Sequence, residues 1–232
     1  IEPDCIKRMY ELIQENDTLL RFEMTGNRNS SEEVKKIDGV HQFEVESERL
    51  WLYWFRLDVI KENAITFDES MKYNEDVIFI TQYKLFSNRM IKSGLQSYNY
   101  NYRMDSAMSS IKQDKRAEAL FRTIEIYRLL IHNSEREEFK EYLQRCQDSS
   151  TAMLLLILLK YYNFRTAQKV FFQLKKIGAY PYKITNNKYS RNYKENIVKL
   201  IYSLFSHNIV YNCALVFGAV VVKKKYKKFE FS

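Results

Sequence analysis

The chain has 232 residues, of which 46% are hydrophobic and 15% aromatic, and it carries a formal net charge of +8 with only 5 glycines and 2 prolines. This composition excludes a disordered chain and favours a globular protein of one large domain or slightly more. Three widely spaced cysteines (Cys5, Cys146 and Cys213) match no metal or redox spacing, so we expect buried thiols in a reducing compartment.

The positive charge is concentrated at one end of the chain. Residues 1–110 have a net charge of −5, residues 111–150 are balanced, and residues 151–232 contain 15 basic and 2 acidic residues. A basic field of this kind suits a polyanionic partner, either an anionic membrane surface or a nucleic acid. No leader of a charged and then an apolar segment follows Ile1, and we expect the chain to be a fragment of a longer protein.

Helix and strand patterns alternate at the start of the chain. An amphipathic helix is predicted after Asp4, and residues 18–24 follow as a strand, which together suggest half of a βαβ unit. Residues 25–47 are polar and are expected to be irregular. Residues 50–63 are predicted to be helical, and residues 64–67 to be a short strand. The apolar face of the first helix consists of Ile6, Met9, Tyr10 and Ile13.

Glu75 and Asp76 open the next predicted helix, directly after Asn74. Asn74 is a favourable N-cap residue, and carboxylates in a first helical turn are stabilised by unpaired backbone N–H groups and by the helix dipole. Both simple capping and catalysis are compatible with such an acid pair. An alternating strand is expected over residues 98–102. The buried face of the helix is predicted to comprise Phe79, Tyr83, Phe86 and Met90.

Beyond residue 111 the pattern is almost entirely helical. Apolar stripes predict helices around residues 120–131, after a capping box of Ser134 and Glu137, and over 167–177, with a stop at Gly178. A further stripe lies at 197–205. Residues 153–159 and 209–222 are apolar but too short to span a bilayer. The second of these runs, which precedes five lysines, fits either a membrane-surface segment or a last core helix.

Several motifs of residues 1–110 occur in a characteristic order. An aromatic segment at 51–56 ends in Arg56, an Ile-x-Phe-x-Glu phrase follows at 65–69, and the Glu-Asp pair opens its helix. Tyr-x-Tyr-Arg at 100–103 then precedes Ser-x-Met at 106–108. This order resembles the second half of a family 2 glycosyltransferase of the bacterial polysaccharide-biosynthesis type. Residues 1–4 are similar to the segment that follows the family's Asp-x-Asp motif.

The resemblance implies an α/β fold, namely the C-terminal, acceptor-side portion of a GT-A (Rossmann-like) domain over residues 1–110. A mainly α-helical, basic region would follow over residues 111–232. The nucleotide-binding part and the Asp-x-Asp ligands of a divalent metal, Mn²⁺ or Mg²⁺, are expected before Ile1, so no metal ligand is assigned in this chain. The reaction implied is inverting, hexosyltransferase-like transfer from a nucleotide-sugar to a hydroxyl group of a saccharide or lipid-linked acceptor in surface polysaccharide synthesis.

The resemblance also implies roles for individual residues. Asp76 would be the general base, and Glu75 would either orient the acceptor or cap the helix. Trp51, Arg56 and Arg103 would bind substrate, although Trp51 could equally belong to the core and Arg103 to a structural salt bridge. Tyr53 stands where the family commonly has a lysine, which weakens any donor-phosphate contact there.

Two functional hypotheses from different classes follow. The first is a cytoplasmic glycosyltransferase without a nucleic-acid partner, with its basic end on the inner face of the cell membrane as an open possibility. The alternative is a basic helical nucleic-acid-binding or scaffolding module without catalysis. In that alternative, lysines would contact phosphates and four tyrosines would stack on bases. These tyrosines are Tyr180, Tyr182, Tyr189 and Tyr193.

Overall fold

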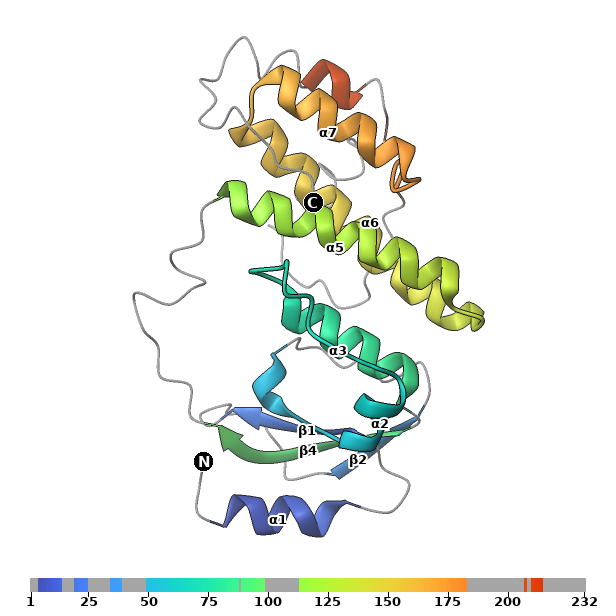
Figure 1. Cartoon of the computed structure of the whole chain (residues 1–232). Helices are drawn as coiled ribbons and strands as arrows, with labels where there is room; N and C mark the ends of the chain where they lie inside the picture. Colours follow the sequence, from blue (N-terminus) through green and yellow to red (C-terminus); the bar gives the residue numbers. More distant parts are fainter. Residues whose placement is uncertain are drawn as a thin grey trace. The chain divides into compact units, whose positions relative to one another are not determined.

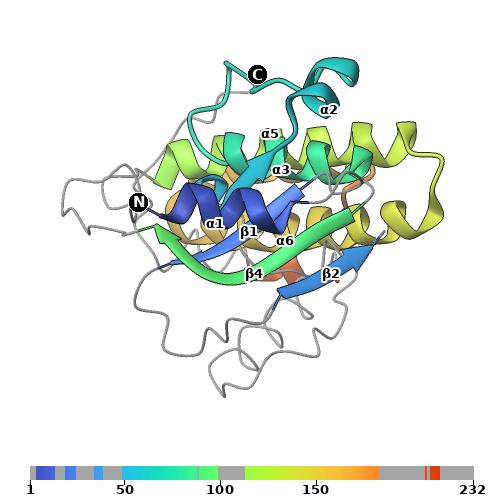
Figure 2. The ribbon, with the colours of Figure 1, turned by 90° about the horizontal axis from the view of Figure 1, so that it is seen from below.

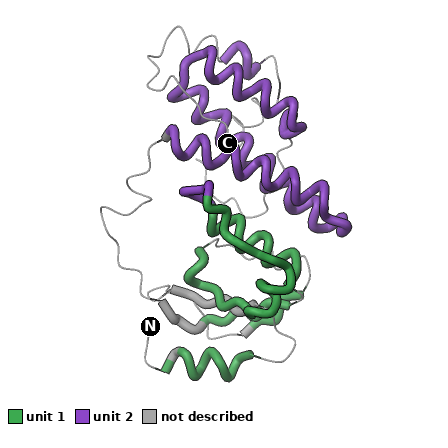
Figure 3. The backbone as a smooth tube through the Cα atoms, in the orientation of Figure 1, with its two compact units in different colours: residues 1–69, 75–110 green, residues 70–74, 111–232 purple. Residues whose placement is uncertain are grey.

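The chain forms two compact units, drawn in two colours in Figure 3. The computed structural model describes residues 4–13, 19–24, 34–38, 49–87, 89–98, 113–182, 207 and 210–214. Unit 1 comprises residues 1–69 and 75–110, and unit 2 comprises residues 70–74 and 111–232. The short segment 70–74 therefore belongs to unit 2, although it lies between two stretches of unit 1.

Unit 1 is an α/β layer structure. Its elements are α1 (Cys5–Leu12), β1 (Leu19–Met24), β2 (Val34–Asp38), the 3-10 turn η2 (Leu50–Leu52), β3 (Tyr53–Phe55), α2 (Leu57–Glu62), α3 (Glu75–Phe86) and β4 (Arg89–Tyr98). The strand order is β2-β4-β1-β3, in which β1 and β4 are parallel and the two outer strands are antiparallel to their neighbours. Figures 1 and 2 show α1 on one face of this sheet and α2 and α3 on the other.

The core of unit 1 includes side chains from α3 and from the aromatic segment that precedes it. Tyr83 of α3 and Met90 of β4 are fully buried, and the Phe55 ring packs edge-on against Phe79 and Tyr83. Burial of these large apolar surfaces stabilises the packing of α3 in this unit. The buried members of this cluster are Leu52, Tyr53, Val59, Ile65, Phe79, Ile80, Tyr83 and Met90.

Helix α1 and strand β1 confirm the first two predicted elements, but the predicted apolar face of α1 is only partly correct. Met9 is buried, whereas the side chains of Ile6 and Tyr10 are 58% and 76% exposed. Ile13, which follows the helix, is exposed as well. The spacing of apolar residues thus predicted the helix correctly, but of its four predicted face residues only Met9 is buried.

Two expectations for residues 25–67 are wrong, and the helix expected over residues 50–63 is confirmed only in part, as the 3-10 turn η2 and as α2. Val34–Asp38 forms strand β2, with Lys36 opposite Ile91 of β4, within a region expected to be irregular. Tyr53–Phe55 forms strand β3 rather than helix, consistent with the preference of aromatic residues for sheets. Ala64 begins no strand: it has φ +48° and lies just after the end of α2.

Helix α3 begins at Glu75, as predicted, and buries Phe79 and Tyr83. The predicted stripe extends too far, however. Phe86 is the last helical residue and is 48% exposed, and Met90 is buried as part of β4 rather than of the helix. The described part of β4 ends at Tyr98, so the rest of the strand expected over 98–102 lies outside the described residues.

Unit 2 is helical in its described part. Its helices are α5 (Gln113–Asn133), α6 (Glu137–Tyr161) and α7 (Phe164–Lys176), followed by a helical turn at 210–214. Residues 134–136 join α5 to α6, which lie side by side (Figures 1 and 2). Helix α6 continues through the apolar run 153–159 as one element. The predicted capping box is wrong, because Arg136 is the N-cap residue of α6 and makes no side-chain cap hydrogen bond.

The three helices and the turn at 210–214 share one core. The buried stripe Ala167, Val170, Phe171 and Leu174 of α7 is confirmed, and the Tyr211 hydroxyl donates a hydrogen bond of 3.1 Å to the Leu155 carbonyl oxygen of α6. The thiols differ from expectation, since Cys146 is half-buried and Cys213 exposed. Within the described ranges, none of the helices combines the length and the apolar character needed to cross a membrane.

Candidate active site

The acid pair is located at the N-terminus of α3, directly after an unusual backbone position. Asn74 has φ +65°, whereas an N-cap residue normally has an extended backbone. Its side-chain Nδ2 donates to Thr123 Oγ1 at 3.3 Å, and Thr123 Oγ1 donates to the Ala119 carbonyl oxygen at 2.8 Å. Both Asn74 and Thr123 belong to unit 2. The residue before the acid pair is therefore held by α5.

The carboxylate of Asp76 is half-buried and interacts with the start of its own helix. Its Oδ1 accepts a hydrogen bond of 2.8 Å from the Val77 backbone N–H. Burial raises the pKa of Asp76 above its ordinary value, the neighbouring Glu75 charge raises it further, and the Val77 N–H lowers it. A carboxylate with a raised pKa binds a proton more readily, as a general base requires.

Glu75 has an unsatisfied oxygen. Its Oε2 is buried and has no hydrogen-bond partner in the described part of the chain. A buried carboxylate oxygen without a donor is costly, because the hydration that it loses on folding is not replaced. A hydroxyl or amide group of a ligand would supply the missing donor. The orphaned oxygen thus gives the acid pair an acceptor that is available to such a donor.

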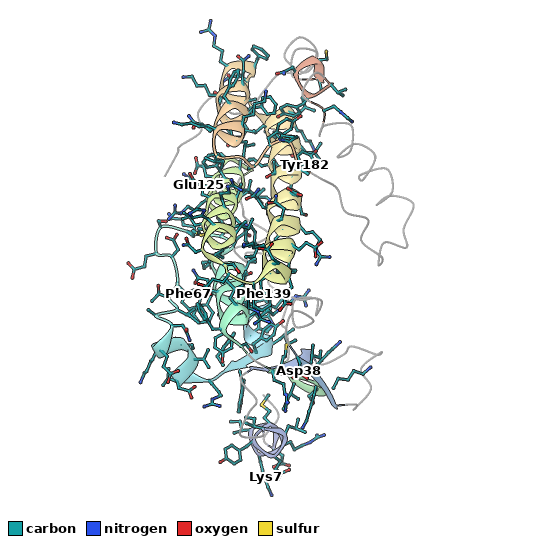
Figure 4. The ribbon with its side chains drawn as sticks, turned by 90° about the vertical axis from the view of Figure 1, so that its right-hand side faces the viewer. Lys7, Asp38, Phe67, Glu125, Phe139 and Tyr182 are labelled. Carbon is teal, nitrogen blue, oxygen red and sulfur yellow. The ribbon has the colours of Figure 1, made fainter. Side chains whose placement is uncertain are left out.

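An exposed aromatic ring stacks on α3 about one helical turn after the acid pair. The Phe67 ring stacks on the Phe79 ring with 4.4 Å between centroids and 11° between planes, and Phe67 is 45% exposed. Phe79 follows Glu75 by four residues and Asp76 by three, so the three side chains share one face of α3. Figure 4 labels Phe67. Sequence reasoning did not select this residue, although it is the Phe of the Ile-x-Phe-x-Glu phrase.

Two predicted substrate-binding residues lie in the described part of the same unit. Trp51 is in the turn η2 and is 40% exposed. The Arg56 guanidinium forms an ion pair with Asp58, which raises the pKa of Arg56 and lowers that of Asp58. The Arg56 backbone N–H donates to the buried Tyr83 hydroxyl at 2.9 Å. Tyr83 follows Asp76 by seven residues, or about 10 Å along the helix axis.

The other predictions for the site concern Arg103, the Tyr-x-Tyr-Arg element and a divalent metal. Arg103 and the Tyr-x-Tyr-Arg element are not among the described residues. No group of three or more His, Cys, Asp or Glu side chains in the described ranges could hold a metal ion. We assign no reaction step to a metal.

The chain matches no protein-family model, and it has no match among curated proteins. Any functional assignment therefore depends on the order of the motifs and on the local chemistry of the acid pair.

Proposed function

We propose that the protein is an inverting, hexosyltransferase-like glycosyltransferase of the family 2 type with a GT-A fold. It would transfer a sugar from a nucleotide-sugar donor to a hydroxyl group of a saccharide or lipid-linked acceptor in surface polysaccharide synthesis. The observation that carries the proposal is the Glu75-Asp76 pair at the start of α3, with a raised pKa at Asp76 and an unpartnered buried oxygen on Glu75. The α/β layers of unit 1 and the preceding motifs support the same assignment.

The proposed reaction is a single displacement. The acceptor hydroxyl donates a hydrogen bond to the Asp76 carboxylate, and its oxygen attacks the anomeric carbon of the donor as the proton passes to Asp76. The bond between the anomeric carbon and the phosphate oxygen breaks, the nucleoside diphosphate leaves with the electron pair, and the configuration inverts. Glu75 Oε2 accepts a hydrogen bond from a second acceptor hydroxyl and orients the sugar. Phe67 packs against the apolar face of a sugar ring.

We place this activity at the cytoplasmic face of the cell membrane. Residues 151–232 have 15 basic and 2 acidic residues, so electrostatic attraction favours an anionic bilayer. A soluble donor and a lipid-linked acceptor meet at such a surface. The burial of two tyrosines argues against the alternative of a nucleic-acid-binding module. Tyr180 and Tyr182, two of the four tyrosines expected to stack on bases, are only 6% and 3% exposed and cannot do so.

The test of the proposal is Asp76→Asn in the full-length protein, assayed against a panel of nucleotide-sugars. We expect kcat to fall by about 10²–10⁴-fold, because the amide cannot accept the proton. Donor affinity, measured by calorimetry, should be unchanged. Glu62→Gln, which removes an exposed carboxylate of α2, is the matched control and should keep full activity. Unchanged turnover in Asp76→Asn would exclude Asp76 as the base, and absence of transfer by the unmodified protein with every donor would refute the proposed function.

A further inference from the structure

Helix α7 has a continuous exposed face that is composed of cations and one aromatic ring. Arg165, Lys169, Phe172 and Lys176 are all exposed, and Phe172 retains 57% of its accessible surface. Their spacing of four, three and four residues aligns them along one side of the helix over about 16 Å. We call these four residues the α7 stripe. The opposite side of α7 is buried in the core of unit 2.

No acid balances these cations locally. Residues 149–182 contain no Asp or Glu, and no ion pair joins Arg165, Lys169 or Lys176 to another described residue. Lys175 adds a further positive charge, with its Nζ atom 4.7 Å from the Phe171 ring centroid and 5.8 Å from that of Phe172. The exposed phenylalanine is thus flanked by cations that are free to contact an anionic partner.

We propose that the α7 stripe is the surface with which the protein docks on an anionic lipid bilayer. Arg165, Lys169 and Lys176 would contact lipid phosphates, and the Phe172 ring would enter the boundary between headgroups and acyl chains. The long side chains of the cations allow their charged ends to remain among the headgroups while the helix lies parallel to the surface. Charge complementarity limits the partner to a polyanion, and the exposed Phe172 ring commits the stripe to an anionic bilayer.

The exposed phenylalanine favours a bilayer over a nucleic acid. A basic face that binds only phosphates needs no apolar group at its centre, whereas an interfacial helix gains free energy when an aromatic side chain leaves water. Stacking on successive bases would require several accessible rings, whereas the rings of Phe171, Tyr180 and Tyr182 next to the exposed Phe172 are buried.

This inference rests on the peripheral location proposed above but not on sugar transfer. Vesicle binding needs no sugar donor, so loss of binding in a stripe variant and failure of the Asp76 test are separate results. The probe is a set of vesicles of phosphatidylcholine with 30% phosphatidylglycerol, compared with vesicles of phosphatidylcholine alone.

The first experiment measures co-sedimentation of the full chain at 0.1 M salt. The variant Arg165→Glu/Lys169→Glu/Lys176→Glu should bind anionic vesicles on the order of 100-fold more weakly, which corresponds to about 1 kcal/mol per cation. The matched control is Lys61→Glu/Lys72→Glu/Arg145→Glu, which makes the same change in net charge at exposed positions elsewhere. Equal binding by the two variants would overturn the proposal, because net charge or another segment would then explain attachment.

The second experiment reports insertion directly. Phe172→Trp should show a blue shift of its emission and quenching by brominated acyl chains in anionic vesicles, after subtraction of the emission of the parent protein. Unchanged emission would exclude insertion. A labelled single-stranded oligonucleotide is the third probe: if the α7 stripe governs its binding at 0.15 M salt while vesicle binding is unaffected, the partner is a nucleic acid and the membrane proposal is wrong.

Discussion

Some surroundings of the Asp76 carboxyl group stabilise its charged form, and others destabilise it. The helix N-terminus and the Val77 N–H favour its charged form, whereas partial burial and the neighbouring Glu75 disfavour it, and burial dominates because the pKa is raised. A carboxyl group whose folded-state pKa exceeds its unfolded-state value contributes stability at low pH, and this contribution is lost as the pH rises through the folded-state pKa. At neutral pH the ionised Asp76 therefore reduces the stability of the fold.

The predicted consequence is that Asp76→Asn is more stable than the unmodified protein at pH 7. The difference in melting temperature should shrink as the pH falls through the folded-state pKa of Asp76, where the protein carries a neutral carboxyl group at this position. Thermal unfolding of both proteins between pH 3 and pH 8 checks this. A variant that is less stable at pH 7 would show that the helix dipole and the Val77 hydrogen bond outweigh burial.

Phe67 provides a second prediction at the level of a single residue. Phe67→Ala removes the exposed ring that stacks on Phe79, so KM for the acceptor should rise about fivefold, in line with about 1 kcal/mol for one aromatic contact. The kcat value should change much less than in Asp76→Asn, because Phe67 takes no part in proton transfer. Phe67→Tyr retains the ring and should restore KM. Phe86→Ala, at the exposed end of α3, is the control; an equal rise of KM in that variant would contradict a local role for Phe67.

The limits of sequence reasoning at the site have a physical basis. Glu75 and Asp76 were identifiable because the Asn-Glu-Asp order predicts a helix start, and α3 begins at Glu75. Phe67 was missed because exposure depends on packing that no local pattern encodes. The Arg56–Asp58 ion pair was missed as well, since residues two apart do not face each other in the helix that was expected there.

At the level of secondary structure, α2 and α7 end in the same way with different residues. In α2, the Ala64 N–H donates to the Lys61 carbonyl oxygen at 3.3 Å and the Ile65 N–H to that of Ile60 at 3.0 Å. In α7, Gly178 and Ala179 form the same pair of bonds to Lys175 and Leu174, at 3.0 and 2.9 Å. Both are Schellman motifs, whose C′ residue needs a left-handed backbone. This residue has φ +48° at Ala64 and φ +72° at Gly178.

Glycine and alanine should therefore have opposite effects at these two helix ends. Ala64→Gly relieves a left-handed alanine and should stabilise the protein by about 1 kcal/mol. Gly178→Ala should destabilise it by at least about 1 kcal/mol, since the new Cβ atom would also lie 3.1 Å from Nη2 of Arg128. Urea unfolding of both variants measures the two changes. Destabilisation by Ala64→Gly would show that glycine's unfolded-state entropy exceeds the strain.

The predictability of the other elements follows the same logic. Helices α3, α5 and α7 have apolar stripes over several turns, and the stop of α7 was marked by Gly178. Strand β2 has the sequence Val-Lys-Lys-Ile-Asp, whose charged residues do not resemble a buried strand. It lies at the edge of the sheet, where charged residues are tolerated because one side of the strand is unpaired. The three-residue strand β3 is too short to show an alternation against its aromatic neighbours.

At the level of the whole molecule, the described residues form two hydrophobic clusters, and each lies within one unit. The cluster of unit 1 includes Ile80 and Met90, and that of unit 2 includes Leu155 and Phe171. Local opening of a protein follows such cooperative clusters, and amide exchange reports the free energy of opening for each segment. Truncation of a core side chain should therefore act mainly on the unit that contains it.

We expect Leu155→Ala to cost about 2–5 kcal/mol, because this side chain is fully buried and its removal leaves a cavity. Amide exchange should accelerate in α5, α6 and α7 far more than in α3 and β4. Ile80→Ala should show the reverse pattern, with its largest effect in α3 and β4, and so each variant is the control for the other. Hydrogen-exchange mass spectrometry of the intact chain resolves these segments. Equal acceleration of both units by either variant would mean that the two clusters unfold as a single cooperative core.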